Sequence, residues 1–323
     1  MKYDIYFHND FDGRASAAVV LAFLRSRGDD IEHFTPVDYD LLPHWLDEHF
    51  FEKHKLFKGR RNPPIIVDFL YHPKAAFWFE HHPTTFKKES WRKGFRPSKF
   101  KTLRAEYASC THLVYDHLKK NFPWKPPRHL MELVKWLDVI DGANYRSAKQ
   151  TLEMKEPAIQ IGNFIEEKAD SLPIASWTIK YLSERPIKDL AKEPRVAKVT
   201  KKVKAETKKK IAFYRKNLKI FGEVMFIDLS GEGSGHPARF VSYALHPKLV
   251  YTVRISPRNG LYHLNAGVNP WRRKENGFNI GNILKKYGGG GHEGVGGVEF
   301  KTKNEALRVA EDVIRILNHK GKK

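Results

Sequence analysis

The sequence has little cysteine, no long apolar segment and a shortage of acidic residues. Its single cysteine, Cys110, excludes an intrachain disulfide and favours a reducing compartment. Its longest mainly apolar run, residues 15–24, is far too short to span a bilayer. Because residues 1–10 also lack a signal-peptide core, we expect a cytoplasmic protein with no membrane partner.

The shortage of acidic residues gives the chain a strong positive charge. Lysine and arginine total 58 and aspartate and glutamate total 37, so the formal net charge is +21 at pH 7. Such a surface attracts polyanions, which predicts a nucleic acid or another phosphate-rich partner. The length of 323 residues and the hydrophobic fraction of 41% suit two globular domains with separate cores.

Strand-like and helix-like segments alternate in the first half of the chain. Residues 3–7, 65–69 and 76–79 have the character of strands, and residues 14–27 that of a helix. This alternation predicts an α/β fold with a doubly wound, mainly parallel sheet. Further helices are expected near residues 104–120, 129–140, 157–169 and 174–184.

A lysine-rich segment separates this region from a smaller α/β domain. Apolar residues recur at helical spacing within residues 198–219, which predicts a basic linker helix that is either solvated or in contact with nucleic acid. We therefore expect a catalytic domain at 1–185, the linker at 186–218 and a substrate-binding domain at 219–323. The last domain is expected to contain strands at 223–229, 248–256 and 261–268, helices at 279–288 and 303–320, and a glycine-rich connection at 230–240.

Carboxylate and imidazole side chains follow three of the predicted strands. The carboxyl ends of parallel strands meet at one edge of a sheet, where ligands bind. Carboxylates crowded there raise one another's pKa values unless a cation lies between them. A mixed carboxylate–imidazole set suits Mn²⁺ or a similar ion better than Ca²⁺, and more than four candidate ligands indicate two metals. The candidates are His8, Asp10 and Asp12 after the first strand, Asp68 at the end of the second, and Glu80, His81 and His82 after the third.

The first of these segments also has a simpler interpretation. Taken alone, HNDFDG at 8–13 is typical of a turn whose aspartates cap the helix that follows. The joint placement of acids and histidines at three strand ends is what favours a metal site.

Four motifs resemble the DHH phosphoesterase family. Its N-terminal motifs are similar to HNDFDG at 8–13, VDF at 67–69 and FWFEHHPTT at 77–85. The Gly-Gly-Gly-His signature of the C-terminal domain found in many of these enzymes is similar to YGGGGHEGVGGVEF at 287–300, and the strand before it to VRIS at 253–256. The resemblance covers most of the chain. It implies a two-metal phosphoesterase similar to the single-strand exonuclease and nanoRNase branches.

The resemblance also implies a role for each candidate. A water molecule bridging two ions, Mn²⁺ or another divalent ion such as Mg²⁺, would lose a proton and attack phosphorus in line. His82 would contact the scissile phosphate. Glu80 stands where the family has aspartate, and it either orients a histidine or signals reduced activity. One ion would be held by His8, Asp10 and Asp68, and the other by Asp12, Asp68, His81 and Asp138.

The remaining implied residues lie later in the chain. The family's fourth motif resembles WLDVIDGANY at 136–145, in which Asp138 is the preferred ligand and Asp141 the alternative. In the second domain, consecutive glycines would let the backbone approach a phosphate and expose N–H donors. The active site would then lie in a cleft between the domains. The substrate-binding residues implied are Arg254, Gly289, Gly290, Gly291 and His292.

These features predict hydrolysis of nucleotide phosphodiesters, in short oligonucleotides or single strands cut from one end. The loop at 86–104 supports a nucleic-acid substrate, because its eight basic residues alternate with aromatic ones. Alternatively, its aromatic side chains pack on the domain. Two other functions stay open, namely hydrolysis of polyphosphate or a cyclic dinucleotide, and nucleic-acid binding without cleavage. The aromatic residues of the loop are Phe86, Trp91, Phe95 and Phe100.

Overall fold

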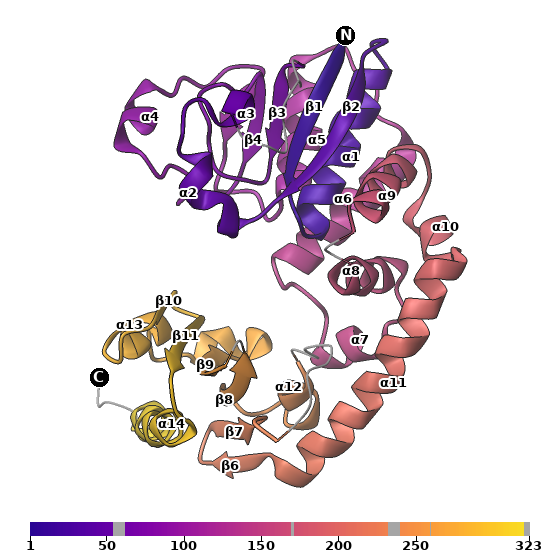
Figure 1. Cartoon of the computed structure of the whole chain (residues 1–323). Coiled ribbons are helices and arrows are strands. Elements are labelled where there is room, and N and C mark those ends of the chain that lie inside the picture. The colour runs from indigo at the N-terminus through magenta and orange to yellow at the C-terminus, as the bar shows by residue number, and fades with distance from the viewer. Residues whose placement is uncertain (54–61, 169–170, 232–239, 259, 320–323) are drawn as a thin grey trace. The chain divides into compact units, whose positions relative to one another are not determined.

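The computed structural model describes the chain except residues 54–61, 169–170, 232–239, 259 and 320–323 (Figure 1). Most of the expected glycine-rich connection at 230–240 therefore lies outside the described residues. The chain divides into two units: Met1–Asn144 with Lys155–Thr200, and Tyr145–Met154 with Lys201–Lys323.

The first unit is built on a five-stranded parallel sheet with strand order β2-β1-β3-β4-β5. This sheet confirms the predicted α/β fold class. Strand β2 lies on one side of β1, and the later strands β3, β4 and β5 lie on the other. The boundary between β1 and β3 is therefore a topological switch point, where open α/β sheets bind ligands. The strands are β1 Lys2–His8, β2 Asp30–Val37, β3 Pro64–Val67, β4 Phe77–Glu80 and β5 Lys101–Leu103.

Helix α1, Phe11–Arg25, is enclosed by the rest of the first unit. Its alanine- and valine-rich sequence is apolar on every side, which is typical of a helix buried all round. The other helices of this unit are η1 Tyr39–Leu41, α2 Leu42–Trp45, α3 Phe50–Lys53, α4 Glu89–Gly94, α5 Cys110–Asn121, α6 Arg128–Asp141, α8 Pro157–Glu167, α9 Leu172–Glu184 and α10 Ile187–Lys192.

The aromatic side chains of the 86–104 loop belong to the core of the first unit. Trp91 is buried, and Phe86 and Phe95 pack against the same cluster as Trp78 and Tyr71. The expectation of a stacking surface for bases is therefore wrong for the buried Trp91, and Phe86 and Phe95, which are partly buried, use part of their surface in packing on the domain. The alternative interpretation, in which the aromatics pack on the domain, holds.

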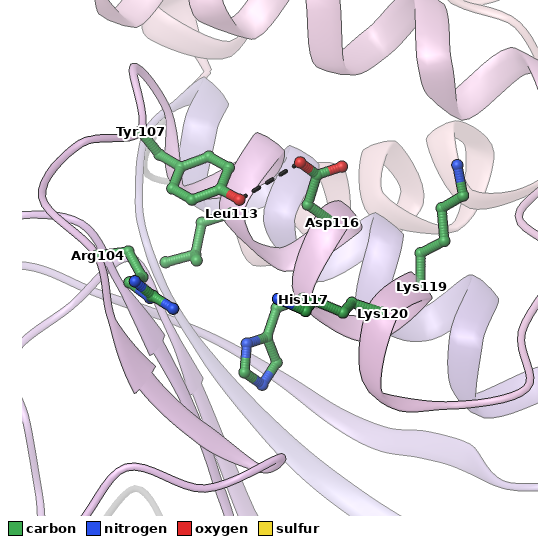
Figure 2. Close-up of a pocket in the computed structure, with 7 residues that line it drawn as sticks. All are labelled: Arg104, Tyr107, Leu113, Asp116, His117, Lys119 and Lys120. Carbon is green, nitrogen blue, oxygen red and sulfur yellow. Dashed lines mark hydrogen bonds between the residues drawn. The ribbon is translucent and has the colours of Figure 1, made fainter.

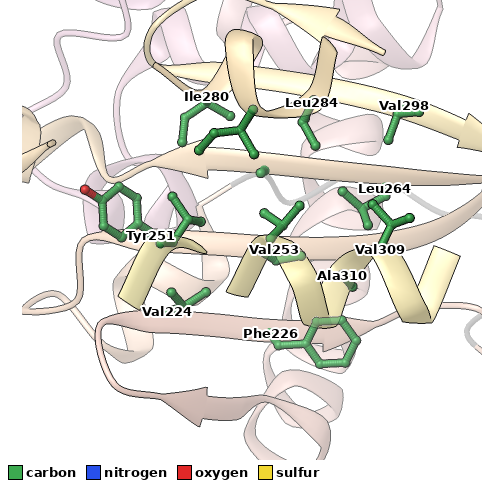
Figure 3. Close-up of a cluster of buried hydrophobic side chains, with 14 of the residues drawn as sticks. Val224, Phe226, Tyr251, Val253, Leu264, Ile280, Leu284, Val298, Val309 and Ala310 are labelled. Atoms are coloured by element: carbon green, nitrogen blue, oxygen red, sulfur yellow. The ribbon is translucent and has the colours of Figure 1, made fainter. Parts of the chain in front are cut away.

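The second unit contains a six-stranded sheet with strand order β10-β11-β9-β8-β7-β6, in which only β7 and β8 run parallel. Two helices supply the apolar cover of this sheet: Figure 3 shows Val309 and Ala310 of α14, and Ile280 and Leu284 of α13, beside strand residues such as Val253. The elements are α7 Ala148–Glu153, β6 Lys219–Phe221, β7 Val224–Asp228, α12 Val241–Leu245, β8 Tyr251–Arg258, β9 Leu261–Val268, η3 Pro270–Glu275, α13 Ile280–Lys285, β10 Gly290–Gly291, β11 Val295–Phe300 and α14 Lys303–Asn318.

The unit boundaries differ from those expected from the sequence. The segment Tyr145–Met154 joins the second unit because Trp271 donates a hydrogen bond from Nε1 to the Tyr145 carbonyl at 2.6 Å, and because Ala148 is buried beside Met225 and Tyr243. The predicted linker forms α10 and the 24-residue helix α11, Pro194–Asn217, which crosses from one unit into the other. No helix among the described residues is both long and apolar enough to cross a membrane.

Candidate metal centre

The loop between β1 and α1 brings the first candidate ligands together. Asp10 caps α1, since its Oδ1 accepts a hydrogen bond from the Gly13 amide at 2.9 Å, and its Oδ2 lies 2.8 Å from Nδ1 of His8. The capping interpretation therefore holds for Asp10, the same carboxylate that is a candidate metal ligand. A Cβ atom at Gly13 would lie 2.1 Å from the His8 carbonyl oxygen, so only glycine permits this tight connection.

Asp12 is fixed by the start of α5, about a hundred residues away. Its two oxygens accept hydrogen bonds from the Cys110 amide at 2.6 Å and from the amide and hydroxyl of Thr111 at 3.0 and 2.6 Å. The N-terminus of a helix suits a carboxylate because its free N–H groups point outward. Even so, burial, followed by the charge of Asp10, raises the pKa of Asp12 above its usual value.

His81 faces three carboxylates and hydrogen-bonds to none of them. Its Nδ1 lies 3.1 Å from the Tyr107 carbonyl, which can only accept, so Nδ1 carries a proton and the neutral form of the ring has its lone pair on Nε2. That buried Nε2 has no hydrogen-bond partner, and it lies 3.7 Å from Asp12, 3.6 Å from Asp68 and 3.5 Å from Asp141. A lone pair among carboxylate oxygens is repulsive unless a cation lies between them.

Asp68 combines burial, an unsatisfied oxygen and an unusual backbone. It has a φ of +54° directly after β3, and its buried Oδ1 has no hydrogen-bond partner. Burial and then the charges of Asp12 and Asp10 raise its pKa well above the usual value. The same causes raise the pKa of Asp141 to about 8. These carboxylates are in electrostatic conflict, and bound divalent cations would relieve it.

The geometry groups the candidates in three overlapping sets around Asp68 and His81. Within each set the potential ligand atoms lie within 4.8 Å of one another, which is close enough to share an ion. Together with the unsatisfied atoms of Asp68 and His81, this donor set fits one or two divalent cations. The sets, found among the described residues, are His8 with Asp10 and Asp68; Asp12 with His81 and Asp141; and Asp68 with Glu80, His81 and His82.

The structure places Asp141, and not Asp138, in this cluster. Asp138 is occupied elsewhere: its Oδ1 accepts from the Ser109 hydroxyl at 2.8 Å, and its Oδ2 lies 2.7 Å from Nδ1 of His112. Asp138 and Asp141 are three residues apart on α6, so their directions differ by about 60° and their positions by about 4.5 Å along the helix axis. The preference for Asp138 is therefore corrected in favour of Asp141, the alternative that the sequence left open.

Glu80 holds His82 in place. Its Oε1 accepts hydrogen bonds from the amides of His81 and His82 at 2.6 and 2.8 Å, and lies 2.9 Å from Nδ1 of His82. This is the contact that an orienting carboxylate would make. The hydrogen bond to Glu80 raises the pKa of His82, whose ring is about half exposed.

In the second unit, the glycine-rich hairpin is shaped by close packing. A Cβ atom on Gly291 would lie 2.3 Å from the Val295 carbonyl oxygen, and one on Gly289 would lie 2.3 Å from that of Gly297. The amides of Gly289 and His292 donate to Leu284 and Val295, so they are not free to bind a phosphate as expected.

Two side chains of this hairpin region remain available to a substrate. Nδ1 of His292 accepts a hydrogen bond from the Gly294 amide at 3.1 Å, so the neutral ring carries its proton on the exposed Nε2 and can donate to an anion. Arg254 lies opposite Asn265 in the sheet, and its buried Nε has no hydrogen-bond partner.

A pocket of about 340 Å³ lies along α5 in the first unit (Figure 2). Tyr107 forms part of its wall, and its hydroxyl donates to Asp116 at 3.3 Å. The backbone carbonyl of the same tyrosine contacts His81, so the pocket and the acidic cluster share a structural element. Its lining includes three cations and one acid, and consists of Arg104, Tyr107, Leu113, Asp116, His117, Lys119 and Lys120.

Several solved structures are similar to this chain over its whole length. The pGpG-specific phosphodiesterase PggH from Vibrio cholerae has a TM-score of 0.75 and 19% identity, covering 99% of this chain and all 100% of that one. RecJ from Thermus thermophilus, in complex with Mn²⁺, has a TM-score of 0.59 and 13% identity, covering 98% of this chain and 52% of that one. An exopolyphosphatase-related protein from Bacteroides fragilis has a TM-score of 0.50 and 13% identity, covering 98% and 92%.

No family model matches the sequence, and no curated protein matches it. The structural similarity shows that this chain has the two-part α/β fold of these proteins. It supports the DHH-type fold that the sequence motifs imply.

Proposed function

We propose that the protein is a metal-dependent phosphodiesterase that hydrolyses nucleotide phosphodiester bonds in short oligonucleotides or single strands. The observation that carries this proposal is the position of the buried His81 Nε2, which has no hydrogen-bond partner and lies 3.5–3.7 Å from three carboxylates. Divalent cations bound there would offset charge on the phosphate and lower the pKa of a water molecule. We assign one ion to His8, Asp10 and Asp68, and the other to Asp12, Asp68, His81 and Asp141.

The chain's own side chains would orient the substrate phosphate. His82 is half exposed, and Glu80 fixes its Nδ1, so Nε2 is left to donate a hydrogen bond to a phosphate oxygen. The raised pKa of His82 favours the protonated, positively charged ring. The exposed cations that line the α5 pocket offer a place for a second phosphate of the substrate. Arg254 and His292, in the second unit, are proposed as substrate-binding residues.

The similar proteins support this substrate class. PggH is a pGpG-specific phosphodiesterase, and another protein of similar structure, RecJ bound to manganese, is an exonuclease. Inorganic polyphosphate is a second candidate. It is favoured by the burial of Trp91, because polyphosphate needs positive charge but no exposed ring for base stacking.

A single panel tests the proposal. The purified protein is incubated with Mn²⁺ and end-labelled RNA and DNA oligomers of two to thirty nucleotides, a cyclic dinucleotide and polyphosphate. We expect cleavage of the short oligomers, and a loss of at least about 10³-fold in the Asp68→Asn variant because this residue would contact both ions. Absence of cleavage with every divalent metal, with nucleic-acid binding retained, would show instead that the protein is a binder.

A further inference from the structure

Helix α11 carries a repeated pair of cations on one face. The pairs are Lys201 with Lys202, Lys208 with Lys209, and Arg215 with Lys216, and the two intervals between them are seven residues each. Seven residues make nearly two turns, so the repeat places the pairs in one row with a spacing of about 10 Å. All six side chains are exposed.

The opposite face of α11 is the one that the protein covers. Val203, Thr207 and Tyr214 are buried, and each is displaced by roughly half a turn from the cation row. Between the pairs, the exposed face carries Ala205 and Ala212. The cation row is therefore a surface of the folded helix and contains no large apolar side chain.

The helix itself carries little acidic charge beside this row. Within residues 201–217 the sequence has a single acidic residue, Glu206, whose carboxylate lies 3.8 Å from Nζ of Lys202. Six cations over about 21 Å of helix create a strongly positive strip, and desolvated apolar contacts are not needed to bind a polyanion there.

We propose that this row, residues 201, 202, 208, 209, 215 and 216, is a docking surface for the phosphodiester backbone of a nucleic-acid strand. The surface would hold a strand by its phosphates and independently of base sequence, because it offers cations and no groups aimed at base edges. It belongs to a different unit from the acidic cluster. The proposal does not depend on hydrolysis.

The chemistry favours nucleic acid over a membrane. An amphipathic helix that lies in a lipid surface places large apolar residues between the cations, and here the exposed positions between the pairs are alanines. Inorganic polyphosphate shares the repeating phosphate chemistry of nucleic acid. It is therefore a separate arm of the test.

The test compares two triple variants in the full-length protein, with EDTA present to prevent hydrolysis. K201Q/K208Q/R215Q removes one cation from each pair, and glutamine keeps the helix because its helix propensity is similar. The matched control, K248Q/K301Q/R308Q, removes three exposed cations elsewhere in the same unit. Circular dichroism and thermal unfolding establish that both variants fold.

Binding is measured with a fluorescent thirty-nucleotide single-stranded DNA at several salt concentrations. We expect the first variant to bind roughly tenfold more weakly at physiological salt, and the slope of log K against log salt to fall by about 2, near 0.7 per lost phosphate contact. The control should change both quantities much less.

Three results would overturn the proposal. The first is an equal loss of affinity in both variants, which would mean that only net charge matters. The second is a loss of binding to vesicles of anionic phospholipid with DNA affinity unchanged. The third is a loss for polyphosphate alone.

Discussion

The candidate sites of the two units differ in whether their polar groups have hydrogen-bond partners within the protein. At the edge of the parallel sheet, Asp68 and His81 have buried atoms without hydrogen-bond partners. In the glycine-rich hairpin, the amides of Gly289 and His292 are satisfied within the hairpin and by α13. The first region is electrostatically incomplete without a ligand, whereas these two hairpin amides need no ligand. Unsatisfied buried charge therefore points to a bound ion more strongly than a run of glycines points to a bound phosphate.

The largest expected effect separates two acids of one helix. Asp141→Asn removes a carboxylate from the cluster, so we expect Mn²⁺ to bind at least about 100-fold more weakly, as measured by isothermal titration calorimetry. Asp138→Asn is the matched control, and we expect a change of less than about tenfold because Ser109 and His112 already occupy that carboxylate. A larger loss in the Asp138 variant would restore the assignment first expected from the sequence.

A second prediction concerns a buried imidazole in the first unit that needs no ligand. His72 is fully buried, its Nδ1 accepts from the Lys74 amide, and burial lowers its pKa from 6.5 to about 4. Since the unfolded chain binds the proton more tightly, stability is full above pH 6.5 and is lost as the pH falls toward 4. The loss should approach about 3 kcal/mol, at 1.4 kcal/mol per pKa unit.

Urea unfolding at pH 7 and pH 4.5 measures this loss. The His72→Gln variant should show a flatter pH dependence, whereas His44→Gln, at an exposed position, should behave as the wild type does. Parallel curves for His72→Gln and wild type would contradict the assignment.

A third prediction tests whether packing fixes the glycines of the hairpin. Gly291 has a φ of +145°, and its Cβ would collide with Val295 and Gly296, so Gly291→Ala should lower the free energy of unfolding by about 2 kcal/mol. Gly290 has open space around the Cβ position, so Gly290→Ala should cost less than about 0.5 kcal/mol. Equal losses in chemical denaturation would show that packing does not distinguish the two positions.

The smallest effect is expected at His292. If its Nε2 donates to a substrate phosphate, His292→Ala should raise KM by about tenfold and leave kcat unchanged, because one hydrogen bond to a charged group is lost from binding. Steady-state kinetics with a short oligonucleotide separates the two constants. A fall in kcat at constant KM would place His292 in the chemical step.

The strands that carry the candidate ligands were predictable, whereas the edges of the sheet were not. Residues 3–7 and 65–69 are mainly apolar and mostly buried in the centre of the sheet, and they correspond to β1 and β3. The edge strands β2 and β5 were missed, since β2 mixes polar residues with Pro36 and β5 has three residues. The helix expected from residue 104 begins at Cys110.

For the site, the sequence could predict which candidate ligands lie at strand ends. It could not predict which acidic side chain of α6 faces those ligands. His8, Asp12 and Asp68 follow from the positions of the strands. The choice between Asp138 and Asp141 depends on how α6 is rotated about its axis where it packs on α5. The local sequence does not predict this rotation. The role of Tyr107, whose carbonyl fixes the tautomer of His81, also has no sequence signal because it uses a backbone atom.

Asp68 also has a consequence for natural variation at this position. Its left-handed backbone conformation is one that glycine adopts without steric penalty, and its buried carboxylate destabilises the ion-free fold. Replacement by glycine would therefore relieve both the backbone strain and the buried charge, and would abolish the proposed activity. At this residue, selection for stability and selection for activity favour different side chains. Conservation of the aspartate in orthologues would therefore indicate that the site is functional.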